Sequence, residues 1–160
     1  MPALACGIEM ATFVTAAPPV LAVVASAARQ SYPDECCGFL FGCWNSASAE
    51  ITSARPVPNV REENRRRRFE ITPGHFAEAE AYAEKHGLDL LGVYHSHPDH
   101  PAEPSQYDLE RALPGFLYLI VSVRKGEVGE GRWWELKPDR TTFLEATQRR
   151  PTTQDTEQRS

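Results

Sequence analysis

Three apolar stretches that are typical of β-strands constrain the fold of this chain most: residues 37–42, 88–94 and 116–123. The first is bounded by glycines and indicates a buried strand, and the last is the most β-like stretch of the sequence. Further short strands are expected over 10–15, 50–57, 69–71 and 131–136. Helices are expected among them, over 20–30, 73–87 and 105–112. Strands and helices that interleave in this way predict an α/β or α+β fold.

Capping residues set the boundaries of the expected helices. Pro18 and Pro19 suit the start of the first helix, because proline is tolerated in a first turn. Thr72 is the expected N-cap of the second helix, with Pro73 at its first position, and Gly87 is the expected stop.

The length and composition indicate one ordinary globular domain. The chain has 160 residues, of which 41% are hydrophobic and 24% are charged, and this is enough to bury a core. We place the domain at residues 8–146 and a disordered polar tail at 147–160. A net charge of -5 argues against a general nucleic-acid binder, since such proteins usually carry net positive charge.

The N-terminal residues and the cysteines predict a cytoplasmic protein without a membrane partner. The first ten residues have neither the basic nor the apolar region of a signal peptide. The longest apolar stretch, 18–28, is shorter than the roughly 20 residues that span a bilayer. The cysteines form no C-x-x-C pair, and Cys36 and Cys37 are adjacent, so we expect buried free thiols in a reducing compartment.

The segment 95–108 carries the residues with the clearest chemistry. His95 and His97 lie two apart at the end of an expected strand, so both side chains point the same way and can face one ion. Neutral imidazoles with this spacing suit zinc, and Asp108 is the natural third ligand, because it lies one turn inside the helix that follows. The loop between them is stiffened, which helps to hold the ligands, by Pro98, Pro101 and Pro104.

This segment resembles the zinc motif of the JAMM (MPN-plus) metallopeptidases, H-x-H-P-x6-S-x-x-D. Every fixed position of the motif is present, at His95, His97, Pro98, Ser105 and Asp108. The same family has an upstream glutamate ahead of a glycine-bearing strand, and Glu35 is similar to that residue. The resemblance extends over about residues 10–140.

The resemblance implies a fold. It is a single-domain, cytidine-deaminase-like α/β/α arrangement, in which helices flank a curved mixed β-sheet and the zinc lies at the edge of the sheet. A deaminase itself is disfavoured, because the H-x-E and P-C-x-x-C motifs of those enzymes are missing.

The resemblance also implies a role for each site residue. His95, His97 and Asp108 would bind one Zn²⁺ per chain, Glu35 would accept a proton from a zinc-activated water and pass it to the leaving amine, and Ser105 would support the oxyanion. The implied activity is that of a zinc-dependent peptidase or isopeptidase. Stand-alone prokaryotic members suggest a bond at the C-terminal tail of a ubiquitin-like or sulfur-carrier protein. Family members that bind such tails hold them as an added strand.

Two other functions remain open at this point. A catalytically idle MPN module would only bind partners, but such modules typically lack the ligands that are present here. A RadC-like, DNA-repair-associated protein shares the ligand spacing, but those proteins usually have asparagine where Ser96 stands, and a longer N-terminal region. The sequence does not predict the oligomeric state.

Several of these residues also have simpler interpretations. Ser105 and Asp108 fit a capping box, which needs no metal. Glu35 could be a solvated turn residue, with its neighbour Asp34 as the rival candidate. Ser96 has no assigned role. Solvated side chains are expected at His75, His86 and His100.

The run from Arg65 to Arg68 has two interpretations. Acidic Glu62, Glu63 and Glu70 surround it and no aromatic ladder accompanies it, which favours a solvated loop over a nucleic-acid site. The alternative is that the run docks an acidic patch of a protein substrate.

Overall fold

The computed structural model describes residues 13–150, and within this range the chain forms seven strands and three helices. In chain order these elements are β1 (Phe13–Ala16), α1 (Pro18–Ser31), β2 (Cys37–Asn45), β3 (Ser48–Val57), α2 (Pro73–His86), β4 (Asp89–Pro98), α3 (Gln106–Arg111), β5 (Leu117–Arg124), β6 (Glu127–Leu136) and β7 (Phe143–Arg149). The described residues therefore form one small mixed α/β domain, as the interleaved pattern predicts. None of the helices in this part of the chain is long and apolar enough to cross a membrane.

The strands form one mixed sheet that closes on itself in the order β1-β3-β2-β4-β5-β6-β7. Closure occurs because β1 pairs in parallel with both β3 and β7. In the middle of the sheet, β4 pairs antiparallel with β2 and parallel with β5. The expectation of a zinc site at an edge of the sheet is therefore wrong for the described residues, because β4 carries the histidines and has a neighbour on both sides.

The helices form where the capping residues predict them. The Thr72 side chain accepts a hydrogen bond of 3.0 Å from the His75 N–H, and Pro73 is the first residue of α2. Gly87 ends α2 with a φ of 65°, a left-handed conformation that glycine adopts without strain. In α1, Pro18 and Pro19 occupy the first turn.

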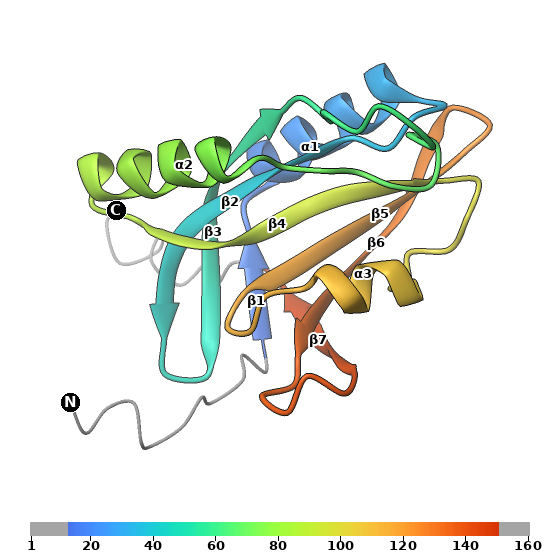
Figure 1. Ribbon diagram of the computed structural model, residues 1–160. Coiled ribbons are helices and arrows are strands. Elements are labelled where there is room, and N and C mark those ends of the chain that lie inside the picture. Colours follow the sequence, from blue (N-terminus) through green and yellow to red (C-terminus); the bar gives the residue numbers. More distant parts are fainter. Residues whose placement is uncertain (1–12, 151–160) are drawn as a thin grey trace, which may run out of the picture.

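Two apolar cores lie on the two faces of the sheet. The inner core joins α1, through Val20, Val24 and Ala28, to side chains from all seven strands. The outer core joins Ala79 and Ala83 of α2 to residues of β2, β4, β5 and β6. Figure 1 shows the resulting layers, with α1 on one side of the curved sheet and α2 and α3 on the other.

Residues 69–71 do not form the expected strand. Phe69 and Ile71 are half-buried and pack against the outer core, but their backbone pairs with no strand. Side-chain packing, including the stacking of Phe69 on His95 with 4.6 Å between ring centroids, holds this segment in an irregular conformation.

Strand β7 is an element that the sequence pattern does not predict. It runs to Arg149, so the polar tail expected from residue 147 does not begin there. Most of its side chains are exposed, which explains the missing apolar signal, and its backbone is held by pairing with β6 and β1. The expected tail from 151 onward, and the expected domain and strand residues before 13, lie outside the described residues.

Candidate metal and active site

The two histidines lie side by side on the outer face of β4. His95 is 1% exposed and His97 is 7% exposed, and the residues that alternate with them, Tyr94 and Ser96, are directed to the inner face and are fully buried. The pairing of β4 with β2 shifts by one residue near Leu91, which places Leu91 in the inner core and Val93 in the outer core. This bulge sets the face on which the following histidines lie.

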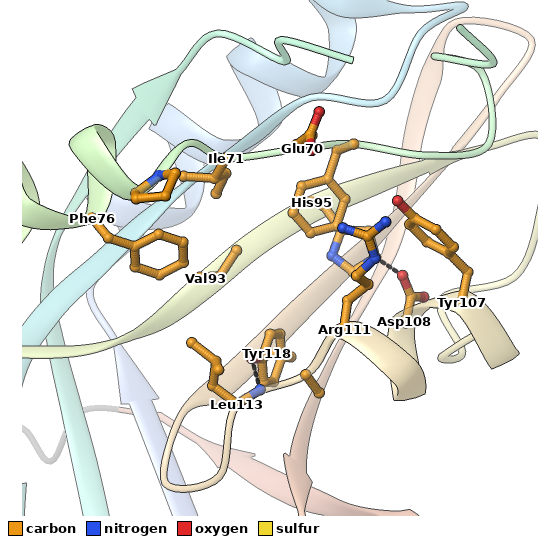
Figure 2. A pocket seen from close by; sticks show the side chains of 13 residues that line it. Glu70, Ile71, Phe76, Val93, His95, Tyr107, Asp108, Arg111, Leu113 and Tyr118 are labelled. Atoms are coloured by element: carbon orange, nitrogen blue, oxygen red, sulfur yellow. Dashed lines mark hydrogen bonds and ion pairs between the residues drawn. The ribbon is translucent and has the colours of Figure 1, made fainter. Parts of the chain in front are cut away.

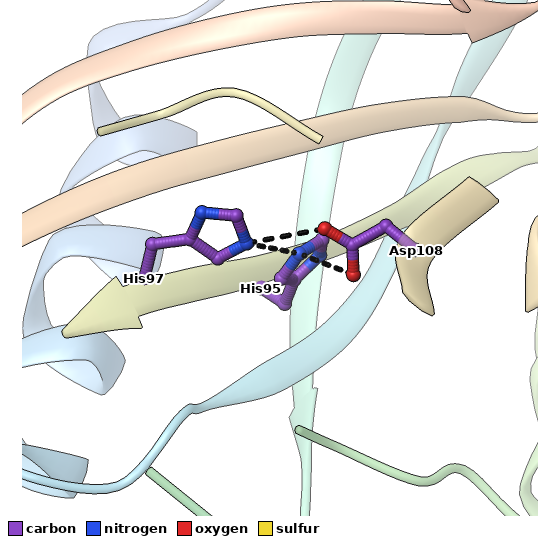
Figure 3. A group of neighbouring side chains, drawn as sticks. All are labelled: His95, His97 and Asp108. Atoms are coloured by element: carbon purple, nitrogen blue, oxygen red, sulfur yellow. Dashed lines mark hydrogen bonds and ion pairs between the residues drawn. The ribbon is translucent and has the colours of Figure 1, made fainter. Parts of the chain in front are cut away.

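The third residue, Asp108, is positioned by the start of α3. The Ser105 hydroxyl accepts a hydrogen bond of 3.1 Å from the Asp108 N–H, and the Ser105 N–H donates one of 2.9 Å to Asp108 Oδ2. The capping box therefore forms, and the same carboxylate lies 3.3 Å from His95 Nε2 and 3.2 Å from His97 Nε2 (Figure 3). The capping and the metal-site interpretations are compatible.

The chemistry of the three side chains fits a cation. The ligand atoms of His95, His97 and Asp108 all lie within 4.8 Å of one another, and the two Nε2 atoms are 3.1 Å apart. His97 Nδ1 donates to the Pro101 carbonyl at 2.8 Å, so in the neutral ring Nε2 presents a lone pair to the cluster. Zinc–nitrogen bonds of about 2.0–2.1 Å in a tetrahedron place ligand atoms about 3.3 Å apart, close to the observed spacing.

Protonation states also suit metal ligands, which must be deprotonated. Burial lowers the pKa of His95, although the Asp108 carboxylate opposes this effect, so the neutral imidazole is favoured. Burial alone would raise the pKa of Asp108, but the His95 and His97 rings and the Ser105 N–H outweigh it and hold that pKa below its usual range.

Glu35 lies in the loop between α1 and β2 and is only 4% exposed. The alternative of a solvated turn residue is therefore wrong. Its Oε1 atom is buried and has no hydrogen-bond partner among the described residues. Burial, with a smaller contribution from the negative charge of Asp108, raises the pKa of Glu35 to about 9. Glu35 lines a cavity of about 310 Å³ together with His97 and Ser105.

Three contacts from distant segments hold the backbone around Glu35. The Glu35 N–H donates to the Arg65 carbonyl at 2.7 Å, and the Asn59 side-chain amide donates to the Glu35 carbonyl at 3.1 Å. The Cys36 N–H donates to the Ser96 hydroxyl at 2.8 Å. Sequence reasoning missed Asn59 and the role of Ser96, because their partners are many residues away; the only local signal is the position of Ser96 between two candidate ligands.

A second cavity of about 310 Å³ opens beside His95 (Figure 2). His95 and Asp108 line it together with an apolar set: Phe69, Ile71, Phe76, Val93, Leu113 and Tyr118. The candidate site thus borders two cavities, one lined mostly by polar residues that include Glu35 and one lined mostly by apolar residues.

The remaining residues singled out by sequence lie apart from the histidine–aspartate cluster or at its rim. His86 and His100 are exposed as expected, whereas His75 is half-buried. Arg65, Arg66 and Arg67 are exposed in a turn, and Arg68 is half-buried. Cys36 and Cys37 are buried free thiols, and burial raises the pKa of Cys36 to about 11; Cys43 is exposed.

A mixed α/β domain with a buried cluster of two histidines and an aspartate, and a buried glutamate near it, defines a protein with a candidate metal-dependent active site. The chain belongs to the family described as prokaryotic homologs of the JAB domain, whose model matches residues 17–137. This membership confirms the resemblance carried by the H-x-H-P motif.

Three relatives have descriptive names. The chain is 42% identical over 91 residues to a desampylase of Haloferax volcanii, covering 56% of this chain and 63% of that protein. It is 36% identical over 104 residues to a desampylase of Pyrococcus furiosus, covering 64% and 66%. It is 35% identical over 94 residues to a probable TtuB-protein conjugate cleaving protease of Thermus thermophilus, covering 57% and 62%. The chain thus spans a little less than two thirds of each relative's length.

Two solved structures are similar to the whole described domain. A protein of Desulfitobacterium hafniense superposes with a TM-score of 0.76 at 26% identity, covering 86% of this chain and 92% of that one. A protein of Salinibacter ruber superposes with a TM-score of 0.68 at 41% identity, covering 87% and 92%.

Proposed function

We propose that this protein is a zinc-dependent peptidase or isopeptidase that hydrolyses bonds at the C-terminal tail of a ubiquitin-like or sulfur-carrier protein. The names of its relatives support the substrate class: two are desampylases, and one is a probable TtuB-protein conjugate cleaving protease. The observation that carries the reaction type is the burial of Glu35, with an unpartnered carboxylate oxygen, in the cavity that His97 and Ser105 also line.

Two imidazoles and one carboxylate favour zinc as the metal, with His95, His97 and Asp108 as its ligands. Zinc bound by such a set acidifies a water molecule and polarises a carbonyl group. The protein holds the ligands ready, because the Pro101 carbonyl orients the His97 ring and the Ser105 N–H orients the Asp108 carboxylate.

Glu35 would carry the proton of the reaction. The attacking water loses a proton to the Glu35 carboxylate, and Glu35 then protonates the leaving nitrogen as the carbon–nitrogen bond breaks. Burial raises the pKa of Glu35 in the metal-free protein, and the positive charge of a bound zinc ion would oppose this effect and favour the carboxylate that accepts the proton. The products are a free carboxylate on the tail and a free amine on the other partner.

Ser105 would stabilise the oxyanion that develops on the carbonyl oxygen. Its hydroxyl oxygen accepts the Asp108 N–H, which leaves the hydroxyl hydrogen free to donate. Ser105 lies in the same cavity as Glu35 and His97, so this donor faces the region where the bond is cut.

The substrate tail would pair with residues 69–71. The closed sheet leaves no edge strand for addition among the described residues, but residues 69–71 have no strand partner and border the apolar cavity next to His95. An extended tail on this segment would gain main-chain hydrogen bonds and place an apolar side chain in that cavity.

The fold class and the cellular compartment are part of the same proposal. The helix–sheet–helix layering supports a place in the wider cytidine-deaminase-like fold class. The free Cys36 and Cys37 thiols support a reducing, cytoplasmic compartment. An idle MPN module is disfavoured, because the three candidate ligands come together with Glu35 beside them.

The proposal is tested with zinc-loaded protein and sulfur-carrier fusions, with the products identified by mass spectrometry. We expect cleavage at the end of the tail, and loss of at least about 100-fold in rate in the Glu35→Ala variant, since general acid–base groups contribute about 10²–10⁴-fold. That variant should retain zinc. An Asp34→Ala variant is the matched control and should cleave normally. Equal rates for Glu35→Ala and wild type would show that Glu35 is not the proton carrier.

A further inference from the structure

Three arginine side chains converge on one aromatic ring at the rim of the candidate site. The guanidinium carbons of Arg68, Arg111 and Arg61 lie 4.5, 4.9 and 5.7 Å from the centroid of the Tyr107 ring. Tyr107 directly precedes Asp108 in α3. Figure 2 shows Tyr107 and Arg111 beside Asp108 and His95. We call Arg61, Arg68, Arg111 and Tyr107 the arginine cluster.

Only one of the three arginines has its donors in use. Arg61 donates to the Tyr107 hydroxyl at 3.0 Å and to the Glu63 carbonyl at 3.1 Å, and so fixes the ring in place. Within residues 13–150, the guanidinium groups of Arg68 and Arg111 donate no hydrogen bond and have no carboxylate within 4.0 Å. Each group carries five N–H donors in a planar fork, so the cluster presents unpaired donors of a single charge.

Among residues 13–150, Arg132 is the arginine whose charge is balanced by carboxylates. Arg132 contacts Glu145 at 2.8 Å and Glu103 at 3.0 Å. At the arginine cluster, Glu70 lines the same cavity as Arg111 but forms no ion pair with the three arginines. A set of guanidinium groups without a partner carboxylate, held in place by a fixed ring, is prepared for an anion from outside the chain.

We propose that Arg68 and Arg111 bind the carboxylate of an aspartate or glutamate side chain of the polypeptide substrate, close to the bond that is cut. This inference rests on the proposed function and adds a specificity to it. Arg111 and Tyr107 line the apolar cavity with His95 and Asp108, so the substrate places an apolar side chain in the cavity and an acidic one at its rim. Planar guanidinium groups match a carboxylate in a bidentate manner.

A peptide fits the surface better than a nucleic acid does. The chain carries a net charge of -5, and the cavity next to the arginine cluster is lined mainly by apolar side chains. A nucleic-acid site would combine a basic groove with a series of stacking aromatic rings, whereas the Tyr107 ring is already covered by guanidinium groups.

The test uses internally quenched peptides that carry a sulfur-carrier tail and a short extension. A single Glu, Gln or Lys is placed in turn at each position near the scissile bond. At one position wild type should cleave the Glu peptide with a kcat/KM at least about tenfold above that of the Gln peptide, as expected for a charge-assisted contact. The Arg68→Gln/Arg111→Gln double variant should lose this preference and retain zinc. Arg29→Gln, an exposed change on α1, should keep it.

Each other result overturns the inference in a distinguishable way. Equal cleavage of Glu and Gln peptides at every position by wild type contradicts the acidic specificity but leaves the proposed function intact. Failure of wild type to cleave either the peptides or a sulfur-carrier fusion contradicts the proposed function, and the inference with it. Binding of a fluorescent single-stranded oligonucleotide that the double variant loses, without a Glu preference, would assign the cluster to nucleic acid. The Arg68→Lys/Arg111→Lys variant is a second check. It keeps both charges but loses the planar guanidinium groups, so it should lose the Glu preference if bidentate contacts carry it.

Discussion

At the scale of single residues, the site concentrates groups that are costly to bury. Glu35, His95 and Asp108 are nearly enclosed, and within the described residues neither Glu35 Oε1 nor His95 Nδ1 has a hydrogen-bond partner. Such atoms lower stability unless a ligand or a proton compensates them. Burial of these groups therefore lowers the stability of the metal-free protein, which is the cost of placing them in the candidate site.

This cost predicts a specific pH dependence for the metal-free protein. The pKa of Glu35 is raised from an ordinary value of 4.5 to about 9 in the folded state. Between these values the folded state binds more protons than the unfolded state. The proton-linked contribution of Glu35 to the free energy of unfolding is therefore fully present below pH 4.5 and is lost as the pH rises toward 9. Glu35→Gln stays neutral, so above pH 8 it should be more stable than wild type.

Urea unfolding of the two proteins in excess chelator, at several pH values between 5 and 9, measures this difference. We expect the gap in the free energy of unfolding to widen with pH. Because the other titrating groups are shared, the difference reports the ionisation of Glu35 together with its coupling to Asp108. Parallel curves would show that Glu35 ionises normally in the fold.

At the scale of elements, the loop between β4 and α3 determines the geometry of the candidate ligands. Trp134 of β6 donates its indole N–H to the Ala102 carbonyl at 3.0 Å, and Arg132 holds Glu103 from the same strand. These contacts fix the loop next to Pro101, whose carbonyl orients the His97 ring. The prolines reduce the freedom of the loop, but its contacts with β6, together with the hydrogen bond from the Ser122 hydroxyl of β5 to the His100 carbonyl, decide where it lies.

Trp134→Phe should therefore weaken zinc binding without altering a ligand. The substitution keeps a ring and removes the donor to the Ala102 carbonyl, and the loss of an outer hydrogen bond typically reduces metal affinity about 10- to 100-fold. The lost hydrogen bond is to Ala102, one residue beyond Pro101, whose carbonyl contacts the His97 ring. We therefore expect zinc affinity to fall by about tenfold, at the lower end of that range, as measured by competition with a chromophoric chelator. Trp44→Phe, on the exposed hairpin of β2 and β3, is the control. Unchanged affinity in Trp134→Phe would contradict the role of the loop.

The elements also show which parts of the secondary structure a sequence pattern predicts and which it does not. The helix start at Thr72 and stop at Gly87 were predictable, because capping is a local interaction. Residues 69–71 have strand-like composition but no neighbouring strand to pair with, and β7 has little apolar character but does have two neighbours. In both cases pairing, which is not local, decides the outcome.

At the scale of the whole molecule, the position of the site depends on how closely the central strands approach. A Cβ atom at Gly92 would lie 1.9 Å from the Leu117 carbonyl oxygen, so no larger residue fits without moving β5. Gly92↔Leu117 is also the first pair between β4 and β5, and the same ladder continues to His97.

Gly92→Ala should accordingly destabilise the protein by about 1–3 kcal/mol, the usual cost of overpacking. It should also lower zinc affinity, because a shift of β5 displaces β4. Gly74→Ala is the matched control: its Cβ would meet only the Thr72 hydroxyl at 3.7 Å, and alanine in a helix is favoured by about 0.5–1 kcal/mol. Chemical denaturation measures both effects. A neutral Gly92→Ala would mean that the two strands can separate at little cost.

The sequence alone predicted the candidate ligands, because the spacing of His95, His97 and Asp108 and the helix cap at Ser105 are short-range features; it predicted Glu35 only through the family resemblance. Only the tertiary structure decided that the sheet closes, that Asn59, Arg65 and Ser96 hold the backbone around Glu35, and that Arg68 and Arg111 meet at Tyr107. These features join residues as far apart as Phe13 and Thr147, and such contacts depend on the packing of the whole domain rather than on any pattern along the chain.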